Sequence, residues 1–168
     1  MEKLKMGDKD IFFVDFENKF KFNGFLDETF RYIEDFQLLN PKLWERFVGQ
    51  FREDADHDGG WRGEYWGKTM RGATFVYSYT KNPELYEILK KTVLDMIDSA
   101  DGEGRISSYY KNHEFEAWDI WSRKYVLLGM EFFLEICEDE DVEKKVIASM
   151  KSQVDYIISK IGKAEDGK

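Results

Sequence analysis

The sequence predicts an all-α protein made of antiparallel helical hairpins, and three observations support this fold class. Apolar residues recur at helical spacing through most of the chain after residue 26. Short polar turns at 81–84 and 138–141 separate pairs of these segments. The two pairs are also related by an offset of about 57 residues, which sets Gly72 on Gly129. Stacked hairpins of this kind build α-solenoids and closed α/α toroids.

The first 25 residues differ from the rest because aromatic residues alternate imperfectly there. This pattern is typical of a short β-strand or an extended arm, and Gly24 ends it. We expect Asp27 to be the N-cap of a helix that reaches the break at Asn40 and Pro41. A second, shorter helix is expected at 41–52.

Residues 53–60 form a polar, glycine-ended segment, which predicts a loop. Its acid spacing suggests a calcium-binding loop as an alternative. The downstream glutamate and the flanking helix pair of an EF-hand are, however, absent in register. A solvated acidic loop is therefore the favoured interpretation.

Four longer helices follow, and they carry the internal repeat. We expect them at 64–80, 84–99, 118–137 and 141–161. The same offset sets Leu85 on Val142 and Leu89 on Val146. Between the hairpins lies a longer, glycine-rich link at 101–110, and such links carry function more often than tight turns do. We expect one domain, with an arm at 1–25, hairpins at 26–162 and a polar tail at 163–168.

Composition narrows the classes of partner. The chain has 168 residues, 42% of them hydrophobic, which suffices for a buried core. Its net charge of −9 argues against binding nucleic acid or an anionic membrane surface, so a neutral or cationic small ligand is favoured. No apolar run has membrane-spanning length and no signal-peptide pattern is present. The single cysteine, Cys137, excludes an internal disulfide, and we expect a cytoplasmic protein.

A first motif, at 61–68, places tryptophans beside charged residues at the start of a helix. Its candidate ligand-contacting residues are Trp61, Glu64, Trp66 and Lys68. Two alternatives stay open, namely a surface ion pair between Glu64 and Lys68, four residues apart, and core packing of the tryptophans. Glycines at 63 and 67 have no side chain, which favours the close approach of a ligand or of another chain segment to the backbone.

A second motif follows about fifty residues later, again at the start of a helix. Its candidate ligand-contacting residues are Trp118, Asp119, Trp121, Arg123 and Lys124. Asp119 is alternatively a helix cap. Because Arg123 and Lys124 enter an otherwise apolar helix, we expect one of them to face a polar cavity or to pair with Asp119 or Glu64. Aromatic faces beside carboxylates and cations suit a sugar ligand.

Three other residues are of types that can bind metals or act as nucleophiles, but no sequence pattern supports such a role for them. His57 and His113 are isolated in expected loops, which favours surface positions over metal ligation. Cys137 lies in an apolar helical run with no adjoining basic residue, so we expect a small buried hydrophobic side chain rather than a reactive thiolate.

These segments together resemble the β-L-arabinofuranosidase family of glycoside hydrolases over nearly all of residues 20–162. The matching segments are, in family order, 22–26, 51–52, 63–68, 79–80, 82–85, 101–102, 106–109 and 118–129. The resemblance implies an α/α toroid of six hairpins whose loops at one end line a sugar-binding pocket. It also implies that this chain is an N-terminal part of such a barrel.

The resemblance limits the expected role of this chain. In the family, an acid/base glutamate and a zinc-bound cysteine nucleophile come from later in the barrel, so we expect no catalytic residue, metal ligand or cofactor here. The expected partner is a carbohydrate, held by the candidate residues of the two motifs, and the chain alone is expected to be inactive. The alternative is an independent helical module that binds a protein partner or self-associates through exposed hydrophobic surface.

Overall fold

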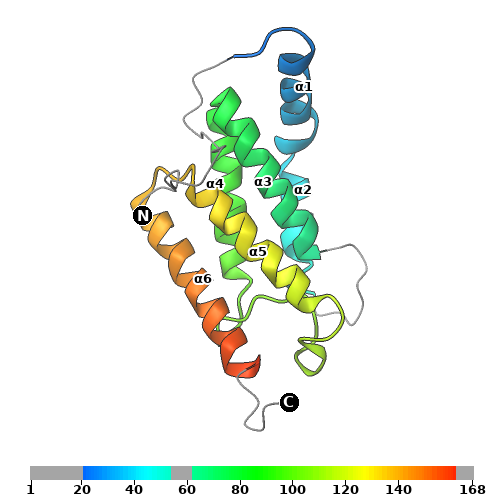
Figure 1. The fold of residues 1–168 in the computed structure, drawn as a ribbon, viewed down its shortest axis with the longest axis vertical. Coiled ribbons are helices and arrows are strands. Elements are labelled where there is room, and N and C mark those ends of the chain that lie inside the picture. Colours follow the sequence, from blue (N-terminus) through cyan, green and yellow to red (C-terminus); the bar gives the residue numbers. More distant parts are fainter. Residues whose placement is uncertain (1–20, 54–61, 162–168) are drawn as a thin grey trace, which may run out of the picture.

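The computed structural model describes residues 21–53 and 62–161, and within these ranges it is all-helical with no strand (Figure 1). The elements are α1 (Phe25–Ile33), the π-helical turn η1 (Glu34–Leu38), α2 (Pro41–Gly49), α3 (Arg62–Thr80), α4 (Pro83–Asp98), the 3-10 turn η2 (Lys111–His113), α5 (Asp119–Leu134) and α6 (Glu140–Ile161). The predicted all-α class is therefore confirmed. Residues 1–20 of the predicted arm, loop residues 54–60 and the tail at 163–168 lie outside the described residues.

Local sequence signals set the starts of α2 and α4. The side chains of Asn40 and Asn82 accept hydrogen bonds from backbone N–H groups two residues later, at 3.2 and 3.0 Å. A proline stands at the first position of each helix, where the missing N–H has no intrahelical partner to lose. The predicted ends of α2, α3, α4, α5 and α6 lie within about three residues of the observed ones. The first predicted helix is instead divided into α1, which ends at Ile33, and η1, which ends at Leu38.

The predicted cap of α1 is wrong. Gly24, with φ of 64°, occupies the N-cap position, and α1 begins at Phe25. Asp27 lies in the first turn instead, where its carboxylate accepts hydrogen bonds from Arg31 Nε at 3.0 Å and from the Tyr79 hydroxyl at 2.8 Å. Glycine takes this left-handed conformation without steric cost, so the chain enters the helix earlier than the acidic residue suggested.

The four longer helices run in alternating directions, so that α3 and α5 lie side by side and parallel while α4 and α6 run back along them (Figure 1). The repeat predicted from the sequence is reflected in the element starts, since α3 and α5 begin 57 residues apart, as do α4 and α6. Its paired positions Leu85 and Val142, and Leu89 and Val146, are all buried in one core. The offset therefore marks equivalent core positions.

Contact between α3 and α5 depends on glycine. A Cβ atom at Gly67 would lie 1.9 Å from the carbonyl oxygen of Tyr125, and one at Gly63 would lie 2.5 Å from that of Ser122. On the facing helix, a Cβ at Gly129 would lie 2.6 Å from the ring of Trp66. The glycines of the first motif thus admit another chain segment, which was one of the two expected explanations.

The close contact between α3 and α5 predicts how substitutions of its glycines change the stability of the fold. Gly67→Ala should lower the free energy of unfolding by more than about 3 kcal/mol, because the new methyl group meets backbone that cannot move aside without separating the helices. Gly72→Ala, in the same helix, has no atom within 4 Å of the new Cβ and should raise stability by up to about 1 kcal/mol. Urea unfolding followed by far-ultraviolet circular dichroism measures both. Equal effects of the two substitutions would contradict the close contact.

Candidate functional site

Exposed aromatic side chains gather where α3 and α5 begin. Trp118 is 52% exposed and Trp121 is 40% exposed, and their ring centroids lie 6.1 Å apart in an edge-to-face arrangement. Tyr125, one turn further along α5, packs against Trp121 at 5.2 Å. We call these three rings, together with Glu64, Lys68 and Lys124, the aromatic surface.

Glu64 joins the two motifs across the helix pair. Its Oε2 accepts a hydrogen bond from the indole N–H of Trp121 at 2.7 Å, and its other oxygen pairs with Lys68. The expected surface ion pair is thus present, but it also orients a tryptophan of the second motif. The hydrogen bonds from Lys68 and then Trp121 lower the pKa of Glu64, while its carboxylate raises the pKa of Lys68. Both groups therefore stay ionised at neutral pH.

Lys124 lies against the aromatic rings. Its Nζ is 3.6 Å from the ring centroid of Trp121 and 3.9 Å from that of Tyr125, while Lys68 Nζ is 5.1 Å from the same tyrosine ring. A cation over an aromatic face is attracted by the ring quadrupole, at about 0.5–1 kcal/mol where the site is exposed. The lysines therefore hold the rings in place while remaining exposed themselves.

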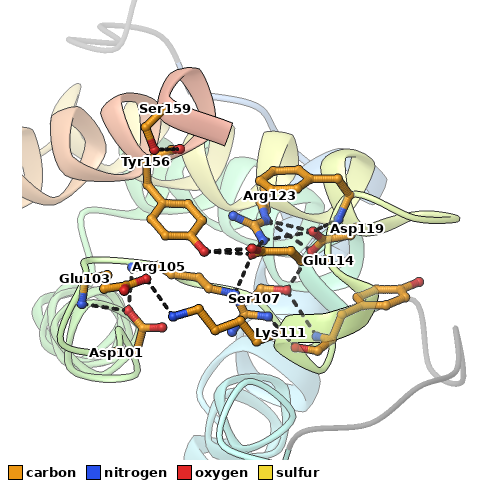
Figure 2. A network of polar contacts seen from close by, with 12 residues as sticks. Asp101, Glu103, Arg105, Ser107, Lys111, Glu114, Asp119, Arg123, Tyr156 and Ser159 are labelled. Atoms are coloured by element: carbon orange, nitrogen blue, oxygen red, sulfur yellow. Dashed lines mark hydrogen bonds and ion pairs between the residues drawn. The ribbon is translucent and has the colours of Figure 1, made fainter. Parts of the chain in front are cut away.

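A buried polar network joins the start of α5 to the link before it and to α6 (Figure 2). Asp119, the first residue of α5, is wholly buried and accepts hydrogen bonds from three groups. These are Arg123 Nε at 3.0 and 3.1 Å, the Ser107 hydroxyl at 2.6 Å and the Phe115 N–H at 2.8 Å. Asp119 thus ties the link before α5 to the helix itself, rather than serving as the helix cap.

Glu114 is the second acid of the network. Its carboxylate receives Arg105 Nε at 2.8 Å, Arg123 at 2.9 Å and the Tyr156 hydroxyl at 2.8 Å. Burial by itself raises the pKa of Glu114, but the hydrogen bonds from Tyr156, Arg123 and Arg105 outweigh it and leave that pKa below its ordinary value. Burial and the neighbouring Glu114 raise the pKa of Tyr156 to about 12, so its hydroxyl remains a donor.

The network constrains the backbone that carries Trp118. Phe115 and Ala117 have positive φ values of 65° and 43°. Residues other than glycine adopt this backbone conformation only when their surroundings impose it. The ring of Phe115 lies 4.6 Å from the guanidinium carbon of Arg123, and its N–H is held by Asp119. The segment that precedes α5 is therefore fixed from both sides.

The structure brings together five of the nine predicted site residues. Glu64, Lys68, Trp118, Trp121 and Lys124 all belong to the aromatic surface. Trp61 lies outside the described residues.

Three predicted residues are instead buried, which corrects the sequence interpretation. Trp66 has no exposed surface, and its indole N–H donates to Thr92 Oγ1 at 3.1 Å, so it is a core residue with nothing to offer a ligand. Asp119 and Arg123 are buried in the polar network, where they pair with each other. That pairing was expected, but a direct contact with a ligand is not available to either side chain.

Sequence reasoning missed four residues of this region. Tyr125 had a usable signal, because it follows Trp121 by one helical turn and must share its face. Arg105, Glu114 and Tyr156 had none, since they come from the link and from α6 and meet only in the folded chain.

Two hollows in the described surface lie away from the aromatic surface. One lies between α2 and α4 and is lined by Trp44, Ile88 and Lys91, among others. The other follows α6 past Tyr156 and Lys160. Neither of these two hollows is lined by Trp118 or Trp121.

The described residues contain no group of three or more histidine, cysteine, aspartate or glutamate side chains able to hold a metal. Cys137 is half-buried, its Sγ lies 3.4 Å from the Asp139 carbonyl oxygen, and burial raises the pKa of its thiol. These surroundings do not fit the zinc-bound cysteine of the resembled family. His113 is a surface residue beside Glu116, and His57 lies outside the described residues. No described helix has the length and apolar character needed to cross a membrane.

Comparisons with protein-family models, with curated proteins and with solved structures gave no match for this chain.

The buried network predicts a pH-dependent stability. Glu114→Gln removes a charge that faces two arginines and should lower the free energy of unfolding at pH 7 by about 3 kcal/mol. Because the pKa of Glu114 is lowered on folding, its contribution is complete above its ordinary pKa and is lost as the pH falls through the lowered value. The difference between wild type and variant should therefore shrink in acid.

Glu116→Gln is the matched control, since the Glu116 side chain is 63% exposed and pairs only with His113 in the described structure. It should change stability by less than about 0.5 kcal/mol at either pH. Urea unfolding at pH 7 and near pH 4 measures all three proteins. A Glu114→Gln deficit that does not diminish in acid would contradict the network.

Proposed function

We propose that this chain binds carbohydrate through the aromatic surface, as part of an α/α toroid glycoside hydrolase of the β-L-arabinofuranosidase type. The observation that carries the proposal is the pair of adjacent, exposed indoles of Trp118 and Trp121, the second of which donates a hydrogen bond to Glu64. Support for the toroid comes from the two helix pairs α3–α4 and α5–α6, which repeat at a constant offset. Parallel inner helices and antiparallel outer ones are the arrangement that such a barrel requires.

Exposure of the tryptophans needs an explanation, because each indole forgoes a large part of the roughly 150–250 Å² of burial that a core position provides. Large exposed apolar groups rimmed by polar residues mark binding sites more often than free surface. An indole face packs well against the C–H face of a sugar ring. Glu64, Lys68 and Lys124 supply the acceptor and donors that sugar hydroxyls need.

The chemistry of the surface favours binding over bond cleavage. Glycoside hydrolysis in most families uses two carboxyl groups that flank the scissile bond, one of them protonated to act as an acid. Glu64 is held ionised by Lys68 and Trp121, and the carboxylate of Asp119 is buried among its donors. We assign the aromatic surface a substrate-holding role, as the family resemblance implies, and the free thiol of Cys137 favours a cytoplasmic location.

Trp118→Ala and Trp121→Ala test the proposal. A glycan array with the wild-type chain identifies a saccharide, and intrinsic fluorescence or calorimetry then gives its dissociation constant. Each substitution should weaken binding about tenfold or more, because a stacked aromatic residue at a binding hot spot contributes about 2 kcal/mol. Tyr32→Ala, an exposed aromatic of α1, is the control and should bind as wild type does. Loss of binding in the control, or none in the tryptophan variants, would refute the assignment.

A second candidate function is self-association. The exposed large apolar residues on α1 and η1 are Phe25, Leu26, Tyr32 and Phe36, and those on α6 are Val154, Ile158 and Ile161. The rings of Tyr32 and Phe36 stack on each other at 5.3 Å. Two apolar faces on different helices permit a head-to-tail contact between copies.

Sedimentation velocity over a range of concentrations tests this second function. If copies associate through these faces, Phe36→Ser and Ile158→Ser should each shift the population to monomer, because each removes apolar area from one side of the contact. Trp118→Ala should leave the association unchanged, which separates this function from carbohydrate binding. A wild-type chain that stays monomeric at high concentration would exclude it.

A further inference from the structure

We propose that the ligand of the aromatic surface is an acidic saccharide, whose uronate carboxylate binds the ammonium group of Lys124 while its ring stacks on Trp118. This inference rests on the proposed function and narrows its substrate class. The aromatic surface contains two ammonium groups, Lys68 and Lys124, and one carboxylate, Glu64.

Glu64 is already engaged by Lys68. The two groups form an ion pair one helical turn apart, and the second carboxylate oxygen accepts the Trp121 indole N–H. Among the described residues, Lys124 forms no ion pair, and its contacts are with the rings of Trp121 and Tyr125. The aromatic surface therefore carries one positive charge that no carboxylate neutralises by direct contact.

The position of this charge suits an anion. Lys124 Nζ lies within 4 Å of two ring centroids, so aromatic carbon replaces part of its hydration shell. An ammonium group that has lost some water gains more from a charge-assisted hydrogen bond, which is roughly twice as strong as a neutral one. Because Lys124 stands over the ring of Trp121, the more exposed indole of Trp118, 6.1 Å away, receives the sugar ring.

The local charge reverses the expectation drawn from the whole chain. A net charge of −9 favoured a neutral or cationic ligand. At short range, however, the ammonium group of Lys124 repels a cation at this surface, because the charge of Lys68 is balanced by Glu64. Acids far from the surface are screened beyond about 8–10 Å at physiological salt. A saccharide that carries one carboxylate satisfies both the indole and the ammonium group, whereas a neutral saccharide satisfies only the indole.

A matched pair of ligands tests the inference. The wild-type chain is titrated with a galacturonate trisaccharide and with the neutral galactose trisaccharide, by calorimetry at about 20 mM salt and again at about 500 mM. The acidic ligand should bind about tenfold more tightly at low salt, and raising the salt should remove most of that preference. Lys124→Met should lower the ratio of the two affinities to near one, and Lys124→Arg should restore most of it.

Lys145→Met is the charge-matched control, because Lys145 is an exposed residue of α6 and not part of the aromatic surface. It should leave the ratio unchanged, and circular dichroism verifies that each variant is folded. Equal binding of the two saccharides by the wild type would overturn the inference while leaving the proposed function intact. Binding of neither saccharide, nor of any glycan on the array, would overturn the proposed function and the inference with it.

Discussion

The close contact between α3 and α5 is the constraint on which the rest of the structure depends. Gly63, Gly67 and Gly129 let the two backbones approach until there is no room for a Cβ atom between them. At that separation Trp66 packs against α5 and is wholly buried. The contact also places the first turns of the two helices side by side, so that Glu64 on α3 reaches the Trp121 indole on α5.

A second constraint comes from the buried charges of the polar network at the start of α5. Arg105 and Arg123 face Glu114 and Asp119, so these four buried ions balance one another in charge (Figure 2). Burying such ions contributes little net stability compared with apolar packing of the same volume, while breaking one pair is costly. The benefit is positional, because the network holds the strained segment before α5 in one conformation.

These two constraints together set the positions of the exposed aromatic residues. The helix contact fixes Glu64 relative to Trp121, and the network fixes the backbone that carries Trp118. Lys124 then occupies the space between neighbouring rings on the outer side. A binding surface that already has its bound conformation before the ligand arrives loses little conformational entropy on binding. Preorganisation of this kind raises affinity without added contacts.

The sequence by itself determined the helices, their asparagine and proline starts, and the repeat of about 57 residues, because these depend on residues close together in the chain. It also determined that tryptophans and charges would gather at the starts of α3 and α5. Only the tertiary structure decided that Trp66 is core and Trp118 is surface, since both stand at the start of a helix among glycine, acid and base. Which indole is covered depends on the neighbour that each helix face meets, and that neighbour is fixed by the glycine contact rather than by local sequence.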